Sequence, residues 1–436
     1  MQIPDAKPKV GFLTATSLVV GNMIGSGIFL LPATLAFYGG ISIFGWVISG
    51  IGAIFLALVF GRLSKLVPNS GGPYAYTREG FGDFAGFIVS WGYWISIICT
   101  NAAIAVTLVS YLSVFIPVIA ASNLTSALIA VGTVWFLTWI NSLGIKRGGN
   151  MQVITTVLKI IPLLAVSIAG IFYLNIDHFQ PWNISSQSNI DAVGATVALT
   201  FFAFMGMESA TIPSEDVKNA SIVIPRATIT GTMLVLLIYM LSYVALMGLI
   251  PPESLQKSTS PFADGAGLIW GDTGRYIIGL GAIISTFGAL NGWILLQGQV
   301  PYAIARDRLF PHSLSKVNIH KAPVTGLVVS SIFITILIIS NFTKGLVGMF
   351  TFMILLTTVV VVFPYLFCSL AEILILIKRK KSKTKFIKPL LVGIPSFLYL
   401  MWALTGVGKD EVYYGLLLII AGIPFYALIK YKTKRE

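Results

Sequence analysis

The chain has 436 residues, of which 56% are hydrophobic and 10% are charged, and its formal net charge is +13. Soluble domains carry about 25% charged residues, so this composition excludes an ordinary soluble protein. It predicts an all-α polytopic membrane protein, because the sequence lacks the alternating segments of about ten residues that build a transmembrane β-barrel.

Apolar runs long enough to cross a bilayer recur along the whole chain. A helix of about 20 residues crosses the hydrocarbon core, and the sequence predicts twelve such helices. The first run is interrupted by glycine and has no small-residue cleavage site before the next run, so we expect no signal peptide. The predicted spans lie near residues 12–37, 41–66, 84–117, 124–143, 151–174, 193–214, 224–250, 277–303, 323–341, 346–377, 388–407 and 411–430.

Most of the 29 lysine and arginine residues fall on one side of the predicted membrane. Because positively charged loops stay in the cytoplasm, both termini are expected there. The basic cluster at 378–388 is expected to contact anionic headgroups of the lipid bilayer, and no nucleic-acid partner is expected. The exceptions are Lys257, Arg275, Lys344 and Lys409 in loops on the other side and Lys159 within a span.

The cysteines and histidines indicate neither a disulfide framework nor a metal centre. Cys99 and Cys368 both fall inside predicted spans. The three histidines, His178, His312 and His320, fall in loops without metal-ligand spacing. We therefore expect no metal and no cofactor.

An unusual stretch, Gly21 to Pro32, lies in the first span and contains Gly25-Ser26-Gly27. Glycine in a helix interior costs roughly 1 kcal/mol relative to alanine. The sequence therefore predicts that the helix breaks near these residues and restarts at Ile28. Unpaired backbone at membrane depth is tolerated only where it lines a cavity or is packed in protein, which indicates a ligand site.

A second break is predicted in the sixth span, in the stretch Phe201 to Pro213. Its spacing from Gly206 to Pro213 equals the spacing from Gly25 to Pro32 in the first span. An odd number of spans separates the two breaks, so they face opposite ways across the bilayer. Matched interrupted helices in two halves of a chain are typical of a transporter binding site, although glycine-rich packing helices are the alternative.

The direction of each broken helix predicts the charge that it binds. The helix that restarts in span one presents N–H groups, which favour an anion such as a carboxylate. The first half of span six ends near Met205 with unpaired carbonyls, which favour a cation such as an α-ammonium. Together the two breaks predict an amino acid as the substrate, while an amine would use only part of the site.

Several short motifs occur along the chain, namely Gly21 to Pro32, Ser70 to Tyr76, Gly206 to Ala210, Val217 to Asn219, Ile224-Pro225, Gly292-Trp293, Gly298-Gln299 and Pro364-Tyr365. They resemble motifs of the amino acid–polyamine–organocation transporters, and over nearly its whole length the chain is similar to the bacterial arginine/agmatine and putrescine/ornithine antiporter branch. The resemblance implies five plus five inverted helices, a LeuT-like fold, working by alternating access in one transmembrane domain of residues 1–436. Repeat one would cover about 10–175, repeat two about 190–378, and two added helices about 387–430.

The resemblance also implies a substrate pocket. Trp293 would form one face, where cation–π attraction contributes about 0.5–2 kcal/mol to an amine or guanidinium. Ile97 and Asn101 share a helix face, and Phe202 stands where the relatives carry a covering tryptophan. The predicted substrate-binding residues are Met23, Ile24, Gly25, Ser26, Gly27, Ile97, Asn101, Phe202, Met205, Trp293 and Thr357.

Two charged residues within spans are expected to act in gating or proton coupling. Glu208 lies near the middle of span six, and an intramembrane ionisable residue is functional by default, with a helix-packing role as the alternative. Lys159 needs a partner, which the carbonyls freed by the first break could supply; the alternative is a lysine that reaches the interface. Tyr93 and Tyr365 are expected in an outer gate and Tyr74 in an inner gate.

The sequence thus predicts a secondary amino acid transporter in the plasma membrane, the inner membrane of a bacterium. Exchange and proton-coupled uptake stay open, with cationic amino acids and their amines favoured over neutral amino acids. Protons as a coupled ion and assembly as a homodimer also stay open, as does a non-transporting amino acid sensor. No channel filter and no catalytic motif such as HExxH or GxSxG is present in the sequence, so neither a channel nor an enzyme is expected.

Overall fold

Helices make up nearly all the regular structure of the protein. The computed structural model describes residues 10–68, 71–144, 149–212, 214, 217–380 and 386–433. Within these ranges no strand longer than an isolated parallel bridge between Val10 and Val217 is present. Ser70 and Pro213, which belong to two of the sequence motifs, lie outside the described residues.

The first half of the described chain contains eight α-helices. They are α1 (Phe12–Met23), α2 (Gly27–Ala36), α3 (Ser42–Leu66), α4 (Pro73–Phe81), α5 (Asp83–Leu112), α6 (Val118–Ala121), α7 (Asn123–Ser142) and α8 (Gly149–Ile171). Short 3-10 helices, η1 (Gly39–Ile41) and η2 (Ile176–Phe179), lie in the connections.

The second half of the described chain begins with α9. Its α-helices are α9 (Asn189–Ala203), α10 (Ala220–Leu249), α11 (Pro252–Lys257), α12 (Pro261–Arg306), α13 (Val324–Asn341), α14 (Gly345–Lys378), α15 (Ile387–Thr405), α16 (Lys409–Ile420) and α17 (Gly422–Thr433). The 3-10 helices here are η3 (Met207–Thr211), η5 (His312–Ser315) and η6 (Phe342–Lys344).

Ten helical stretches in the described chain are long and apolar enough to cross a membrane. This confirms the prediction of an all-helical, multi-pass membrane protein. One helix differs from its predicted span at 277–303, because α12 already begins at Pro261. The residues before the predicted span include Asp264, Asp272 and Arg275, so this part of the helix is not an apolar run. The helix is kinked at Gly271, which has a non-helical conformation with φ of 67°.

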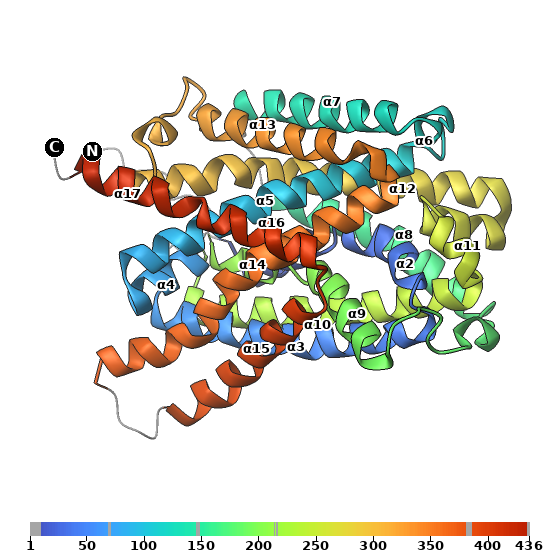
Figure 1. Cartoon of the computed structure of the whole chain (residues 1–436), viewed down its shortest axis with the longest axis horizontal. Helices are drawn as coiled ribbons and strands as arrows, with labels where there is room; N and C mark the ends of the chain where they lie inside the picture. Colours follow the sequence, from blue (N-terminus) through green and yellow to red (C-terminus); the bar gives the residue numbers. More distant parts are fainter. Residues whose placement is uncertain are drawn as a thin grey trace.

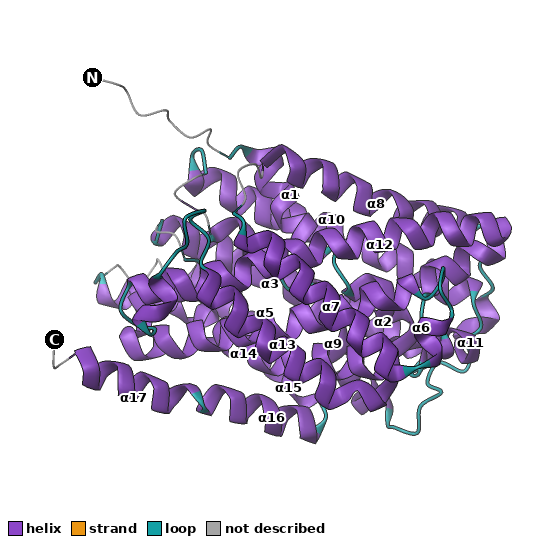
Figure 2. Cartoon of the chain, turned by 90° about the horizontal axis from the view of Figure 1, so that it is seen from above, coloured by secondary structure: helices purple, strands orange, loops and turns teal. Residues whose placement is uncertain are grey.

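The helices form a layered bundle whose axes run mostly along one direction (Figure 1). Helix α5 lies at the centre and packs against α14 and α12, while α10 packs against α3, α8 and α1. In the most apolar stretch of α5, 94% of the residues are buried, against 17% in the stretch 409–431 at the C-terminal end. Accordingly, α16 and α17 run along the outside of the bundle (Figure 2).

The two ends of the bundle carry different short helices. Helix α4 lies at one end, and α6 and α11 lie at the other (Figure 1). We refer to these as the α4 end and the α11 end. The broken helices α1–α2 and α9–η3 lie inside the bundle between them, where α1 contacts η3 and α2 contacts α9.

Candidate functional site

The first helix breaks where the glycines predicted it. Helix α1 ends at Met23 and α2 begins at Gly27, so three residues separate them. The first N–H groups of α2 have no partner within the helix, and the last carbonyls of α1 are equally free. Two of those carbonyls find side chains: the Tyr239 hydroxyl donates to the Met23 oxygen at 2.6 Å, and Lys159 donates to the Gly21 oxygen at 3.0 Å.

The second break lies in the sixth predicted span and touches the first. Helix α9 ends at Ala203, and the chain resumes at Met207 as a 3-10 turn. Between them Gly206 has a φ of 97°, a left-handed conformation that favours glycine. A Cβ atom at Gly206 would lie only 3.1 Å from the carbonyl carbon of Asn22, so the two breaks meet backbone to backbone.

The two breaks enclose a narrow central cavity. Its volume of about 10 Å³ admits about one water molecule, so the helices must separate to admit an amino acid. Seven of the predicted substrate-binding residues line it. They are Met23, Gly25, Ser26, Gly27, Phe202, Met205 and Trp293.

Four predicted binding residues lie away from the cavity wall. The Asn101 amide nitrogen donates to the Gln297 side-chain oxygen at 2.7 Å, which ties α5 to α12. The Thr357 hydroxyl donates to the Met353 carbonyl of its own helix at 2.7 Å. Ile24 and Ile97 are fully buried in the hydrophobic core. The structure therefore does not bring these four side chains to the cavity.

Sequence reasoning missed three residues of the cavity wall: Asn22, Thr100 and Ile104. Asn22 lies in the first glycine motif, and its amide nitrogen donates to the Ser209 hydroxyl at 2.8 Å, across the two breaks. Thr100 and Ile104 lie on α5, one and two turns beyond Ile97. The helical periodicity could have identified this face, but it does not decide between Thr100 and Asn101, because neighbouring residues differ by only about 100° around the axis.

Glu208 lies in a fully buried cluster beside the second break. One carboxylate oxygen accepts the Tyr93 hydroxyl at 2.8 Å. The other accepts the Tyr365 hydroxyl at 2.5 Å and the Gly206 N–H at 3.2 Å. The side chains come from α5, η3 and α14, so one carboxylate holds three elements together.

The expected division into an outer gate of Tyr93 and Tyr365 and an inner gate of Tyr74 is wrong. Tyr93 and Tyr74 line one and the same cavity, of about 520 Å³, at the α4 end. Tyr365 shares the Glu208 carboxylate with Tyr93, so it belongs to the same layer. The physical reason is the position of Tyr93, which lies two turns before Thr100 on α5, toward α4.

Tyr74 belongs to a polar network at the mouth of that cavity. Its hydroxyl donates to Asp307 at 2.7 Å and accepts from Arg78 at 3.0 Å. Arg78 also pairs with Asp83 at 2.9 Å. Burial, and then the Asp307 carboxylate, raise the pKa of Tyr74, so its hydroxyl stays protonated at neutral pH and the bond to Asp307 persists.

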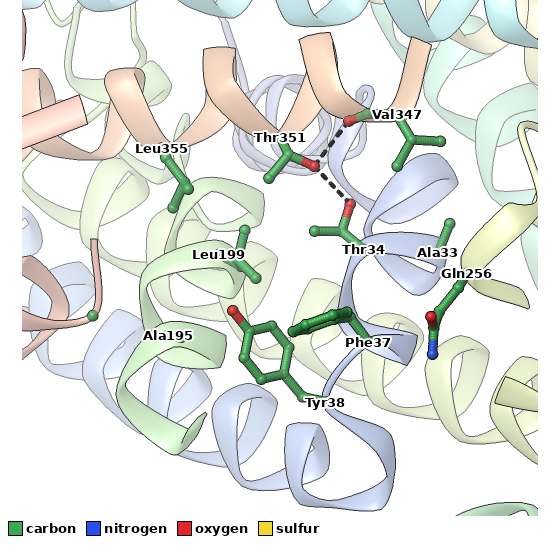
Figure 3. A pocket seen from close by; sticks show the side chains of 11 residues that line it. Ala33, Thr34, Phe37, Tyr38, Ala195, Leu199, Gln256, Val347, Thr351 and Leu355 are labelled. Carbon is green, nitrogen blue, oxygen red and sulfur yellow. Dashed lines mark hydrogen bonds between the residues drawn. The ribbon is translucent and has the colours of Figure 1, made fainter. Parts of the chain in front are cut away.

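A second cavity, of about 300 Å³, lies at the α11 end between α2, α9, α11 and α14. In Figure 3 the Thr34 and Thr351 side chains point toward each other, and their hydroxyls lie 3.1 Å apart. Thr351 also donates to the Val347 carbonyl at 2.8 Å. The hydrogen bond between Thr34 and Thr351 joins the second half of the first broken helix to α14. The central cavity thus lies between two larger cavities, one toward each end of the bundle.

Lys159 is 4% exposed and lies on α8 beside the first break. Its bond to the Gly21 carbonyl matches the prediction that freed carbonyls receive this cation. Within the described residues, no carboxylate lies within ion-pair distance of it. A fixed cation at this position would repel a sodium ion.

These features define a multi-pass membrane protein in which two broken helices meet at a central cavity. A sequence model of the amino acid permease family matches residues 10–425. The chain therefore belongs to the amino acid permease family, within the amino acid–polyamine–organocation transporters, as its motifs had indicated.

The chain is similar to several bacterial transporters. It is 31% identical over 427 residues to a putrescine transporter, PotE, of Haemophilus influenzae, covering 97% of this chain and 98% of the relative. It is 35% identical to a cadaverine/lysine antiporter of Escherichia coli, covering 76% of this chain and 74% of the relative. It is 32% identical to an arginine/ornithine antiporter of Pseudomonas aeruginosa, covering 99% and 92%.

Proposed function

We propose that this chain is a secondary transporter that exchanges cationic amino acids and their amines across the bacterial inner membrane by alternating access. Three of its relatives carry or exchange putrescine, cadaverine and lysine, or arginine and ornithine. These substrates share a primary amine, and each carries a second cationic group. The proposal extends this common chemistry to the present chain.

The observation that carries the proposal is the central cavity between the two breaks. Ser26 directly precedes α2, beside N–H groups that attract a carboxylate, while α9 ends at Ala203 with carbonyls that attract an ammonium. The cavity wall contains no charged side chain among its lining residues. Backbone dipoles therefore hold the amino-acid group, and the transported side chain faces Trp293, Thr100 and Ile104.

The proposed fold has twelve spans, arranged as an inverted repeat of five plus five helices with two added helices. The presence of one break in α1–α2 and another in α9–η3 supports the repeat. Twelve spans are supported because the stretch 324–378 contains both α13 and α14, and because α8 has 23 residues. Repeat one would cover about 10–175, repeat two about 190–378, and the added helices about 387–430.

The proposed orientation follows from the charge asymmetry, which puts both termini in the cytoplasm. The termini themselves lie outside the described residues. In this orientation the α4 end, with Arg78 and Arg306, faces the cytoplasm, and the cavity of about 520 Å³ opens inward. The Tyr93–Glu208–Tyr365 cluster then separates this cavity from the centre and is the proposed proton-sensing gate.

One observation favours a second candidate, a proton-coupled permease for neutral amino acids. Ile104, Met205 and Phe202 make much of the cavity wall apolar, and no carboxylate is present to pair with a cationic side chain. Lys159 supports proton coupling in place of sodium coupling, because its cation occupies the freed carbonyls.

Counterflow in proteoliposomes separates the two candidates. Vesicles containing the purified protein and loaded with unlabelled lysine are given labelled lysine, ornithine, arginine, putrescine, cadaverine, leucine or alanine, with and without a proton gradient. Accumulation of the cationic compounds without a gradient supports the exchanger. Accumulation of leucine or alanine alone supports the neutral permease, and no accumulation above protein-free vesicles would contradict both.

Lys159→Ala is expected to lower the exchange rate at least tenfold, while KM stays within about threefold of the wild-type value. The reason is that Lys159 bonds α8 to the end of α1 and does not contact the substrate. Initial rates over a concentration series measure both parameters. Lys159→Met keeps the volume and removes the charge, so it should match alanine if the hydrogen bond matters and the wild type if only packing matters. A rise in KM at an unchanged rate would contradict the proposed role.

A further inference from the structure

The central cavity contains one polar side chain from α5, that of Thr100. Thr100 is 3% exposed, lines the cavity, and has a hydroxyl without a partner. Among the buried side-chain atoms of the described chain that lack a partner, only the hydroxyls of Ser26 and Thr100 belong to residues of this cavity wall. Ser26 lies at the start of α2, beside the N–H groups that attract a carboxylate.

A threonine within a helix usually has a simple way to satisfy its hydroxyl, by donating to the carbonyl four residues earlier. Several buried threonines here use it, among them Thr107, which donates to Ala103 at 2.9 Å, and Thr286, which donates to Ala282 at 2.7 Å. Thr228 and Thr232 on α10 do not use it. Thr100 does not, although Thr107 lies on the same helix. A buried hydroxyl without a partner costs free energy, so its orientation needs a compensating partner that the protein itself does not supply.

The remaining wall leaves little else that could recognise a polar substrate side chain. The Asn22 amide nitrogen is bonded to Ser209. Glu208 lies outside the cavity wall, and both of its oxygens accept hydrogen bonds within their own cluster. The other lining side chains include Ile104 on α5 and Trp293 on α12. A hydroxyl oxygen accepts from an ammonium, and an indole face attracts it, so together they suit a primary ammonium without an ion pair.

We propose that Thr100 determines specificity by accepting a hydrogen bond from the side-chain ammonium of the transported amino acid. The inference rests on the proposed exchange of cationic amino acids and names the contact that selects them. A site built around a hydrogen bond discriminates against analogues that lack the donor, because its own polar group is then left unpaired. Norleucine is such an analogue of lysine, and norvaline is such an analogue of ornithine.

The test compares Thr100→Val with the wild type in proteoliposomes. For labelled lysine or ornithine, whichever the wild type exchanges faster, KM should rise roughly tenfold, since one hydrogen bond to a charged group is lost. Inhibition by norleucine or norvaline should stay the same or become stronger, because valine has the shape of threonine and leaves no hydroxyl unpaired. Thr100→Ser keeps the hydroxyl and should retain the wild-type preference.

Thr107→Val is the matched control, because the Thr107 hydroxyl is bonded within α5 and Thr107 does not line the cavity. This variant should leave the ratio of the apparent affinities for lysine and norleucine unchanged. The inference is wrong if Thr100→Val weakens the binding of lysine and of norleucine by the same factor. It is also wrong if the ratio of the two affinities stays as in the wild type. If Thr100→Val exchanges nothing, equilibrium binding of labelled lysine and its competition by norleucine decide the same ratio.

The experiment also separates this inference from the proposed function. A wild type that exchanges no cationic compound contradicts the proposed function, whatever Thr100 does. If the wild type exchanges lysine or ornithine and Thr100→Val has the same substrate preference as the wild type, only the role of Thr100 is overturned.

Discussion

Replacing Gly27 with valine is expected to abolish exchange. A Cβ atom at Gly27 would lie 3.2 Å from both the Cα and the Cβ of Ala203, and 3.6 Å from the Phe202 ring. Ala203 is the last residue of α9, so the backbones of the two broken helices approach each other at this point. Overpacking of this kind costs about 1–3 kcal/mol and would separate the two ends that form the cavity.

The measurement is counterflow of a labelled cationic amino acid at saturating concentration, together with substrate binding in detergent. Ser26→Ala should weaken binding less than Gly27→Val, because alanine keeps the backbone N–H groups of α2 and removes only a hydroxyl. Gly132→Val is the matched control, since a Cβ atom at Gly132 in α7 meets nothing within 4 Å. Silent results for both Ser26→Ala and Gly27→Val would place the binding site elsewhere.

Glu208→Gln is expected to lower the exchange rate about tenfold and to flatten its dependence on pH. The carboxylate accepts three donors, from Tyr93, Tyr365 and the Gly206 N–H. An amide accepts at only one atom, so at least one of these donors loses its acceptor, at a cost of about 1–3 kcal/mol. The amide also does not ionise, so a pH response that passes through this residue should disappear.

Exchange rates across a pH series, measured for the wild type and the variant, test this expectation. Glu253→Gln on α11 changes an exposed carboxylate and should leave the profile unaltered. Tyr365→Phe removes one donor while leaving the carboxylate, so it should lower the rate and keep the pH response. A wild-type pH profile in Glu208→Gln would remove the proposed proton-sensing role.

The positions of the two helix breaks could be predicted because glycine acts locally. Gly25 and Gly27 weaken the helix by their own conformational freedom, and α1 ends at Met23 as expected from them. The partner of Lys159 could also be anticipated, because a break necessarily frees carbonyls one turn earlier. The part of α12 before the kink at Gly271 could not be predicted, since it is not part of an apolar run and carries Asp264.

The arrangement of the gate residues depended on tertiary packing. Tyr93 and Tyr365 lie far apart in the sequence, and their common partner Glu208 is what assigns them to one layer. That layer adjoins the cavity of Tyr74, so a division into outer and inner tyrosines does not hold. The order of the spans determines the direction in which each helix crosses the membrane. The depth of a side chain depends on the position of its helix along the axes of the neighbouring helices.

By itself, the sequence determined that this protein is helical, crosses a membrane and is broken at two matched points, because hydropathy and glycine content act within a single helix. Only the tertiary structure decided which face of α5 reaches the cavity. Thr100 and Asn101 are adjacent, and the hydrogen bond from Asn101 to Gln297 on α12 directs that amide away from the centre. Thr100 is left on the cavity wall, because a rotation of about 100° per residue separates it from the neighbouring residue that contacts another helix.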